Sequence, residues 1–128
     1  MNLIEKANLI ISQPLTDDDV TELQKIKREM AKLYDQAITI AWMQEAEYNQ
    51  TRSSKYISIK KKAKETGVKY TETEMEMIAK DEAENKFGEW RTAKAKASWM
   101  KAKYEAIRDI CVDYYTRQKN TKDASITT

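Results

Sequence analysis

Histidine is absent from this chain of 128 residues, and cysteine, proline and glycine are scarce, with one, one and two copies. Without histidine the chain lacks the commonest general base, the Ser-His-Asp triad and most zinc sites. Because the only glycines are Gly67 and Gly88, no glycine-rich loop can hold a nucleotide phosphate. We therefore expect a protein that is not an enzyme and that uses no metal and no other cofactor.

Long apolar runs are also absent, and the segment at residues 40–43 is far shorter than the ~20 residues that cross a bilayer. No basic-then-apolar leader opens the chain, and Cys111 has no partner for a disulfide. Cys111 falls on an apolar helical spacing, which predicts a buried small hydrophobe and not a nucleophile. These features predict a cytoplasmic protein without a membrane partner.

Helix-forming residues dominate what is present, and turn residues at regular intervals are missing, so we expect an all-α fold. Long amphipathic helices should form a helical hairpin or coiled-coil-like bundle within one domain, residues 1–119. The expected elements, in chain order, are a short helix at 2–12, a long helix at about 17–48, a basic segment at 49–66, a long helix at about 72–119 and a disordered tail at 120–128.

Local signals mark the ends of these helices. Thr16 with Asp19, and Thr71 with Glu74, have the spacing of capping boxes at helix N-termini. Gly67 suits the position just past a helix C-terminus. Residues 49–54 are poor helix formers, which predicts a hinge or a frayed turn there.

The last helix carries the most regular apolar spacing, in steps of three and four, and Gly88 is expected to kink it near its middle. The hydrophobic fraction of 41% is low for a self-contained core, so we expect a homo-oligomer with an undefined number of subunits. Whether the long helices pair within or between chains stays open. The residues expected at the oligomer interface are Trp90, Met100, Tyr104, Ile107, Cys111 and Tyr114.

Positive charge is concentrated in residues 48–64, which hold six bases and no acid, although the net charge of the chain is only +2. Six bases without an acid repel one another, and phosphates would relieve that repulsion through counterion release. Tyr56 adds a surface on which a base can stack. The block therefore predicts binding of single-stranded nucleic acid through Arg52, Lys55, Tyr56, Lys60, Lys61, Lys62 and Lys64.

A second basic stretch contains the near-repeat of residues 94–96 at 101–103, two helical turns later. It predicts a secondary basic face of Lys94, Lys96, Lys101 and Lys103. A solvated charged face is the alternative interpretation of both stretches. Nucleic-acid binding is slightly favoured for residues 48–64, whereas the solvated face is favoured for the second stretch. Neither stretch specifies DNA or RNA, or a base sequence.

The basic segment after a long helix, the turn and cap at residues 67–76, and the amphipathic helix of residues 90–118 resemble the layout of the UvsY-type recombination mediators of large phages. The resemblance covers about residues 37–119. It implies an oligomer in the host cytoplasm that binds single-stranded DNA. Such a mediator helps to load a recombinase onto strands covered by a single-stranded-DNA-binding protein. The alternative is a coiled-coil scaffold or assembly chaperone that acts through protein–protein contacts.

Overall fold

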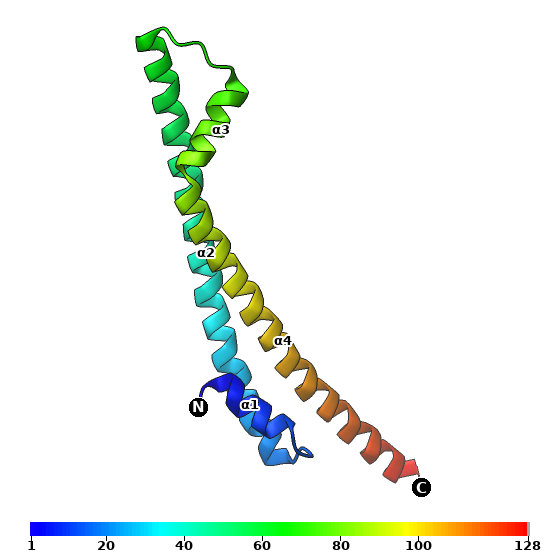
Figure 1. The fold of residues 1–128 in the computed structure, drawn as a ribbon. Helices are drawn as coiled ribbons and strands as arrows, with labels where there is room; N and C mark the ends of the chain where they lie inside the picture. The colour runs from blue at the N-terminus through cyan, green and yellow to red at the C-terminus, as the bar shows by residue number, and fades with distance from the viewer. Residues whose placement is uncertain (128) are drawn as a thin grey trace. The chain divides into compact units, whose positions relative to one another are not determined.

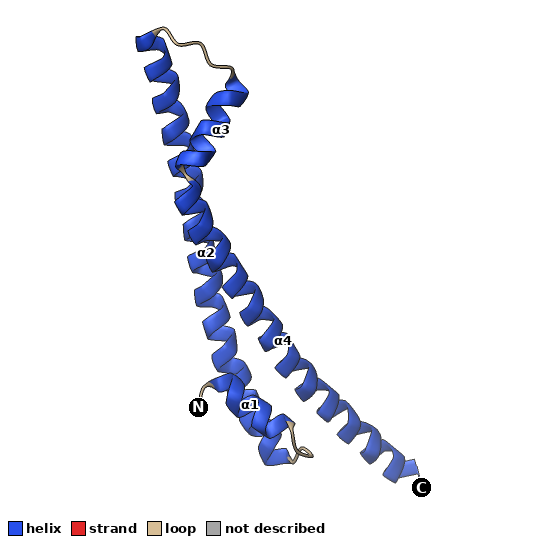
Figure 2. Ribbon diagram, in the orientation of Figure 1, coloured by secondary structure: helices blue, strands red, loops and turns tan. Residues whose placement is uncertain are grey.

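The computed structural model describes residues 1–127, with side chains through residue 121, and is 89% helical. The helices are α1 (Leu3–Ile11), α2 (Asp17–Thr66), α3 (Glu72–Glu82) and α4 (Glu84–Thr127) (Figure 1). No strand occurs in this part of the chain (Figure 2). The all-α fold is therefore confirmed. Helices α2 and α4 pack against each other, so the long helices pair within the chain.

The predicted helix ends are confirmed by their hydrogen bonds. The backbone N–H of Asp19 donates to Thr16 Oγ1 (3.2 Å), and the N–H of Thr16 donates to Asp19 Oδ2 (3.0 Å). At α3 the N–H of Glu74 donates to Thr71 Oγ1 (3.2 Å). Gly67 follows α2 with φ of 71°, the left-handed region in which glycine is favoured.

Helix α2 continues through residues 49–54, where the sequence predicted a hinge. Two side chains of this region, Thr51 and Arg52, are half-buried, and Tyr48 just before them is buried. Poor helix propensity costs only a few tenths of a kcal/mol per residue, so such packing outweighs it. The basic segment is therefore part of one helix of 50 residues.

The last arm is divided at Ala83, whereas the sequence predicted one helix kinked at Gly88. The N–H of Ala83 donates to the carbonyl oxygens of Ala79 (3.1 Å) and Lys80 (3.2 Å), and α4 begins directly afterwards. Ala83 is buried, and Gly88 lies inside α4. Neither glycine nor proline is present at residue 83, so the break coincides with a buried alanine and not with a helix-breaking residue. Helix α4 also continues to Thr127, beyond the expected end near Lys119, since no glycine or proline stops it. Thr128 lies outside the described residues.

Two compact units divide the chain. The first contains Met1–Gln36 and the chain from Ser98 onward, so α1, the first part of α2 and the second part of α4 build it. Leu3, Ile4 and Ile10 of α1 pack against its buried cluster. The members of that cluster are Ala7, Val20, Leu23, Ile26, Met30, Ile107 and Cys111.

The second unit is Ala37–Ala97 and contains the basic end of α2, all of α3 and the start of α4. Its core is aromatic, since the rings of Tyr48 and Trp90 stack at 5.7 Å between centroids and Phe87 lies 5.3 Å from Tyr48. Met75 and Ala79 bury the inner face of α3. The unit therefore holds α3 beside the basic end of α2 (Figure 1).

The six residues expected at the oligomer interface all lie on faces that pack inside the chain. Ile107 and Cys111 belong to the buried cluster of the first unit, and Met100, Tyr104 and Tyr114 pack against it. Trp90 belongs to the aromatic core of the second unit. Ile107 and Cys111 are buried within the chain, whereas the other four side chains are partly exposed. Association through these residues stays a prediction.

Candidate nucleic-acid interface

Four lysines of the basic block occupy the last two turns of α2. Lys60, Lys61, Lys62 and Lys64 are all exposed. Among the side chains that the structure describes, none of the four has an ion-pair partner. The hydroxyl of Thr66 donates to the carbonyl oxygen of Lys62 (2.8 Å) and so satisfies one group of this helix end. The C-terminus of a helix carries partial negative charge, which stabilises nearby cations. This effect offsets part of the repulsion between the four lysines.

The other predicted members of the site, Arg52, Lys55 and Tyr56, face α3 or its surroundings. Lys55 pairs with Glu82 of α3 at 3.9 Å, and both side chains are about half exposed. The guanidinium carbon of Arg52 lies 5.6 Å from the centroid of the Tyr48 ring. The sequence offered no nearby acid for this block, but the fold brings one from α3, which lowers the self-repulsion of the six bases.

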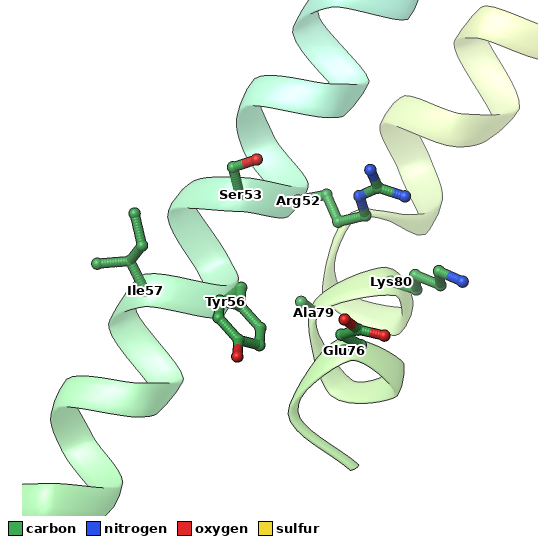
Figure 3. A pocket seen from close by; sticks show the side chains of 7 residues that line it. All are labelled: Arg52, Ser53, Tyr56, Ile57, Glu76, Ala79 and Lys80. Carbon is green, nitrogen blue, oxygen red and sulfur yellow. The ribbon is translucent and has the colours of Figure 1, made fainter. Parts of the chain in front are cut away.

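An open cavity of about 420 Å³ lies between α2 and α3 (Figure 3). Its α2 side is Arg52, Ser53, Tyr56 and Ile57, and its α3 side is Glu76, Ala79 and Lys80. Figure 3 shows the half-buried Tyr56 ring turned towards α3. Arg52, Glu76 and Lys80 have no ion-pair partner among the described side chains. An aromatic face and unpaired charges of both signs thus line one cavity.

A second open cavity, of about 500 Å³, lies next to the first and shares Arg52 and Lys80 with it. Tyr48, Phe87 and Trp90 give this cavity an aromatic wall, and Asp81 and Glu84 give it carboxylates. We call the two cavities together the α2–α3 groove. Each has its own aromatic residues and acids, and the two cations lie where they meet.

Near this groove, Lys86 joins α4 to α2. Its ammonium group lies 3.4 Å from a carboxylate oxygen of Glu47 and 3.4 Å from one of Glu89. The hydrogen bond to Glu47, followed by that to Glu89, raises the pKa of Lys86. This lysine therefore pairs with acids of its own unit, in contrast to the four lysines at the end of α2.

The secondary basic face is divided between two kinds of environment. Lys94 Nζ lies 5.6 Å from the Trp90 ring centroid, and Lys103 Nζ lies 5.8 Å from that of Trp99. Lys96 and Lys101 are exposed. Half of this predicted face therefore consists of cations that already contact an aromatic ring of the same helix.

One sequence pattern that predicts cation–π contacts is an aromatic residue followed four positions later by a lysine or an arginine. It occurs at Tyr48 with Arg52, Phe87 with Arg91, Trp90 with Lys94, Trp99 with Lys103, and Tyr104 with Arg108, and in every case the cation lies within 6.0 Å of the ring centroid. Residues four apart are neighbours on a helix, so the spacing by itself predicts these contacts. Tyr56 with Lys60 has the same spacing in the basic block, and Lys60 is exposed. The spacing therefore does not by itself separate the lysines of the block from the cations that contact a ring.

In the described part of the chain, no helix is long and apolar enough to cross a membrane. No group of three or more cysteine or acidic side chains there is placed to hold a metal ion. Comparison with protein-family models, with curated proteins and with solved structures finds no match. The interface is therefore interpreted from its own geometry and charge.

Proposed function

We propose that this chain is a non-enzymatic accessory protein that binds single-stranded DNA. The observation that carries the proposal is the set of four exposed lysines without ion-pair partners on the last turns of α2: Lys60, Lys61, Lys62 and Lys64. Exposed lysines without ion-pair partners can neutralise phosphates, and each such contact releases counterions that are condensed on the DNA. Tyr56 and the α2–α3 groove lie on the same unit and supply the aromatic surface that single-strand binders use.

The recombinase-loading role is the finer part of this proposal and is supported by the resemblance of layout to UvsY-type mediators. In that role the protein acts in the cytoplasm, of the host if a phage encodes it. Its partners are a recombinase, a single-stranded-DNA-binding protein and further copies of itself. A direct measurement is the rate at which a recombinase replaces the single-stranded-DNA-binding protein on a labelled strand, with and without this chain. An unchanged rate would remove the loading role and leave DNA binding in place.

The test of DNA binding is fluorescence anisotropy of a labelled oligonucleotide at a series of salt concentrations. Replacing the four lysines by alanine should weaken binding to every sequence and flatten the salt dependence, since each lost phosphate contact lowers the slope by about one. The helix content should stay, because alanine is at least as good a helix former as lysine.

The secondary basic face offers a matched control. Changing Lys94, Lys96, Lys101 and Lys103 to alanine removes the same formal charge, and two of these lysines already contact tryptophan rings. This variant should keep more of the affinity and of the salt slope than the variant of the basic block. If both variants lose affinity equally, only the net charge matters and the proposed location is wrong.

A second candidate function is a structural scaffold that self-associates. Ile40, Trp42 and Met43 of α2 are exposed by 50%, 64% and 60%, and exposed apolar clusters commonly mark protein contacts. The exposed lysines 60–64 and the exposed acids Glu72 and Glu74 are complementary in charge, so a second copy is the partner that this unit fits. Sedimentation of Trp42→Ser beside the unchanged protein tests it. A smaller assembly without any oligonucleotide binding would favour the scaffold.

A further inference from the structure

The α2–α3 groove has a composition that phosphate binding alone does not explain. It contains two cations that form no ion pair in the described part of the chain, Lys80 and Arg52, and the guanidinium of Arg52 also lies over the Tyr48 ring. It further contains the carboxylate of Glu76, which has no ion-pair partner among the described side chains. A carboxylate beside a phosphate site lowers the affinity for the phosphate. A ligand that matches this lining must carry a negative group, a flat apolar group and a hydrogen-bond donor close together.

A nucleotide within a single strand has these three features. Its phosphate is the negative group, its base has a flat face, and cytosine, adenine and guanine carry an exocyclic amino group that donates hydrogen bonds. Thymine has no such amino group. The first cavity, at about 420 Å³, lies within the range of about 300–1,000 Å³ that is typical of small-ligand sites.

We propose that the α2–α3 groove binds one dinucleotide step of the strand and selects bases that carry an amino group. One base stacks on Tyr56 in the first cavity and donates its amino hydrogen to the carboxylate of Glu76. The phosphate that follows lies between Arg52 and Lys80, where the two cavities meet. The next base lies in the second cavity, whose carboxylates are Asp81 and Glu84.

This inference rests on the proposed function, because the lysines of α2 are what bring the strand to the groove. It adds a property that the lysines cannot provide. Contacts to phosphates are independent of sequence, whereas a carboxylate that accepts from a base edge discriminates between bases. Lys80, on α3, also joins the site here.

The first experiment uses the unchanged protein with two labelled oligonucleotides of equal length, oligo(dC) and oligo(dT). Both bases are pyrimidines of similar size, but thymine also carries a 5-methyl group. Oligo(dU), which lacks both the methyl and the amino group, is measured beside them and should bind as oligo(dT) does. We expect oligo(dC) to bind about tenfold more tightly than oligo(dT), as for one base-edge contact. Equal affinities would overturn the inference while leaving DNA binding intact. Failure of both oligonucleotides to bind at low salt would remove the proposed function itself.

The second experiment uses Glu76→Gln. Glutamine can both accept and donate, so it can pair with thymine as well, and the preference for oligo(dC) should disappear. Glu74→Gln is the matched control, because it removes one acid from the same helix outside the groove and glutamine suits that third helical position equally well. The control should keep the tenfold preference. Loss of the preference in both variants, or in neither, would contradict the role of Glu76.

Two further variants separate the parts of the groove. Tyr56→Leu should weaken both oligonucleotides by about tenfold or more without changing the salt slope, because stacking involves no counterion. Lys80→Ala should lower the slope by about one and keep the preference for oligo(dC). A Lys80 variant with an unchanged slope would show that the phosphate does not lie at the junction of the two cavities. Circular dichroism of each variant checks that the helices are intact.

Discussion

At the scale of single residues, one hydrogen bond in the first unit connects α4 to α2, and no local sequence pattern predicts it. The phenol of Tyr114 on α4 donates to a carboxylate oxygen of Asp17 in the first turn of α2. This hydrogen bond is the largest cause that raises the pKa of Tyr114 to about 12 from its ordinary 10.0. The protonated phenol is therefore favoured in the folded state.

The pH dependence of stability follows from this shift. Between pH 10 and about 12 the folded chain keeps the Tyr114 proton while the unfolded chain has lost it, so the free energy of unfolding decreases as the pH rises. The contribution is complete below pH 10. We expect Tyr114→Phe to show a smaller decrease over this range, measured by urea denaturation at successive pH values. The same decrease in both proteins would mean that other groups cause it.

Cys111 is a second residue whose chemistry is set by the core. It is 1% exposed, and its burial raises the pKa of the thiol. Since the thiolate is the reactive form, we expect slow reaction with a disulfide reagent at neutral pH in the folded chain and fast reaction in denaturant. A variant with Cys111→Ser and Ser98→Cys places the thiol on the exposed side of α4 and should react quickly without denaturant. Rapid labelling of Cys111 in the folded protein would contradict its burial.

At the scale of the helices, the two glycines have opposite roles although both have open space around the missing Cβ. Gly67 has a positive φ of 71°, so Gly67→Ala should destabilise the chain by about 1 kcal/mol, the cost of a left-handed backbone with a side chain. Gly88 lies inside α4, so Gly88→Ala should stabilise it by about 1 kcal/mol. Thermal or urea denaturation of both variants measures the difference. A loss of stability in Gly88→Ala would indicate that this position does need glycine.

The break between α3 and α4 is a feature of the elements that neither glycine explains. Ala83 has φ of −95° and ψ of 8°, and its side chain is 1% exposed. Alanine is the best helix former, so the local sequence favours continuation of the helix through this residue. The break places α3 against α2, where Glu82 reaches Lys55 and the groove forms. Packing therefore overrides propensity at the position that creates the candidate site.

At the scale of the whole molecule, the long helices α2 and α4 pack against each other within the chain. Ile107 is 4% exposed, so Ile107→Asp would bury an unpaired charge. We expect this variant to lose helix content, or to unfold at a much lower denaturant concentration, because the cost falls on the folded chain itself. Circular dichroism and sedimentation together measure it. A smaller assembly with unchanged helix content would instead place Ile107 between subunits.

Much of this protein could be predicted from local sequence. Four features depend only on neighbours within one or two helical turns. They are the all-α class, the N-caps at Thr16 and Thr71, the end of α2 before Gly67, and the concentration of lysines at residues 60–64. Capping, backbone conformation and charge density are local properties. The single sequence is sufficient for them.

Tertiary structure alone decided the rest. Four features depend on residues distant in the chain. They are the continuity of α2 through residues 49–54, the break at Ala83, the burial of the apolar face of α4 that includes Ile107 and Cys111, and the ion pair of Lys55 with Glu82 of α3. Periodicity identifies an apolar face but does not identify what covers it. Charge counts identify bases but not the acids that folding brings beside them. Those facts are set by which helices meet, and only the packed chain determines that.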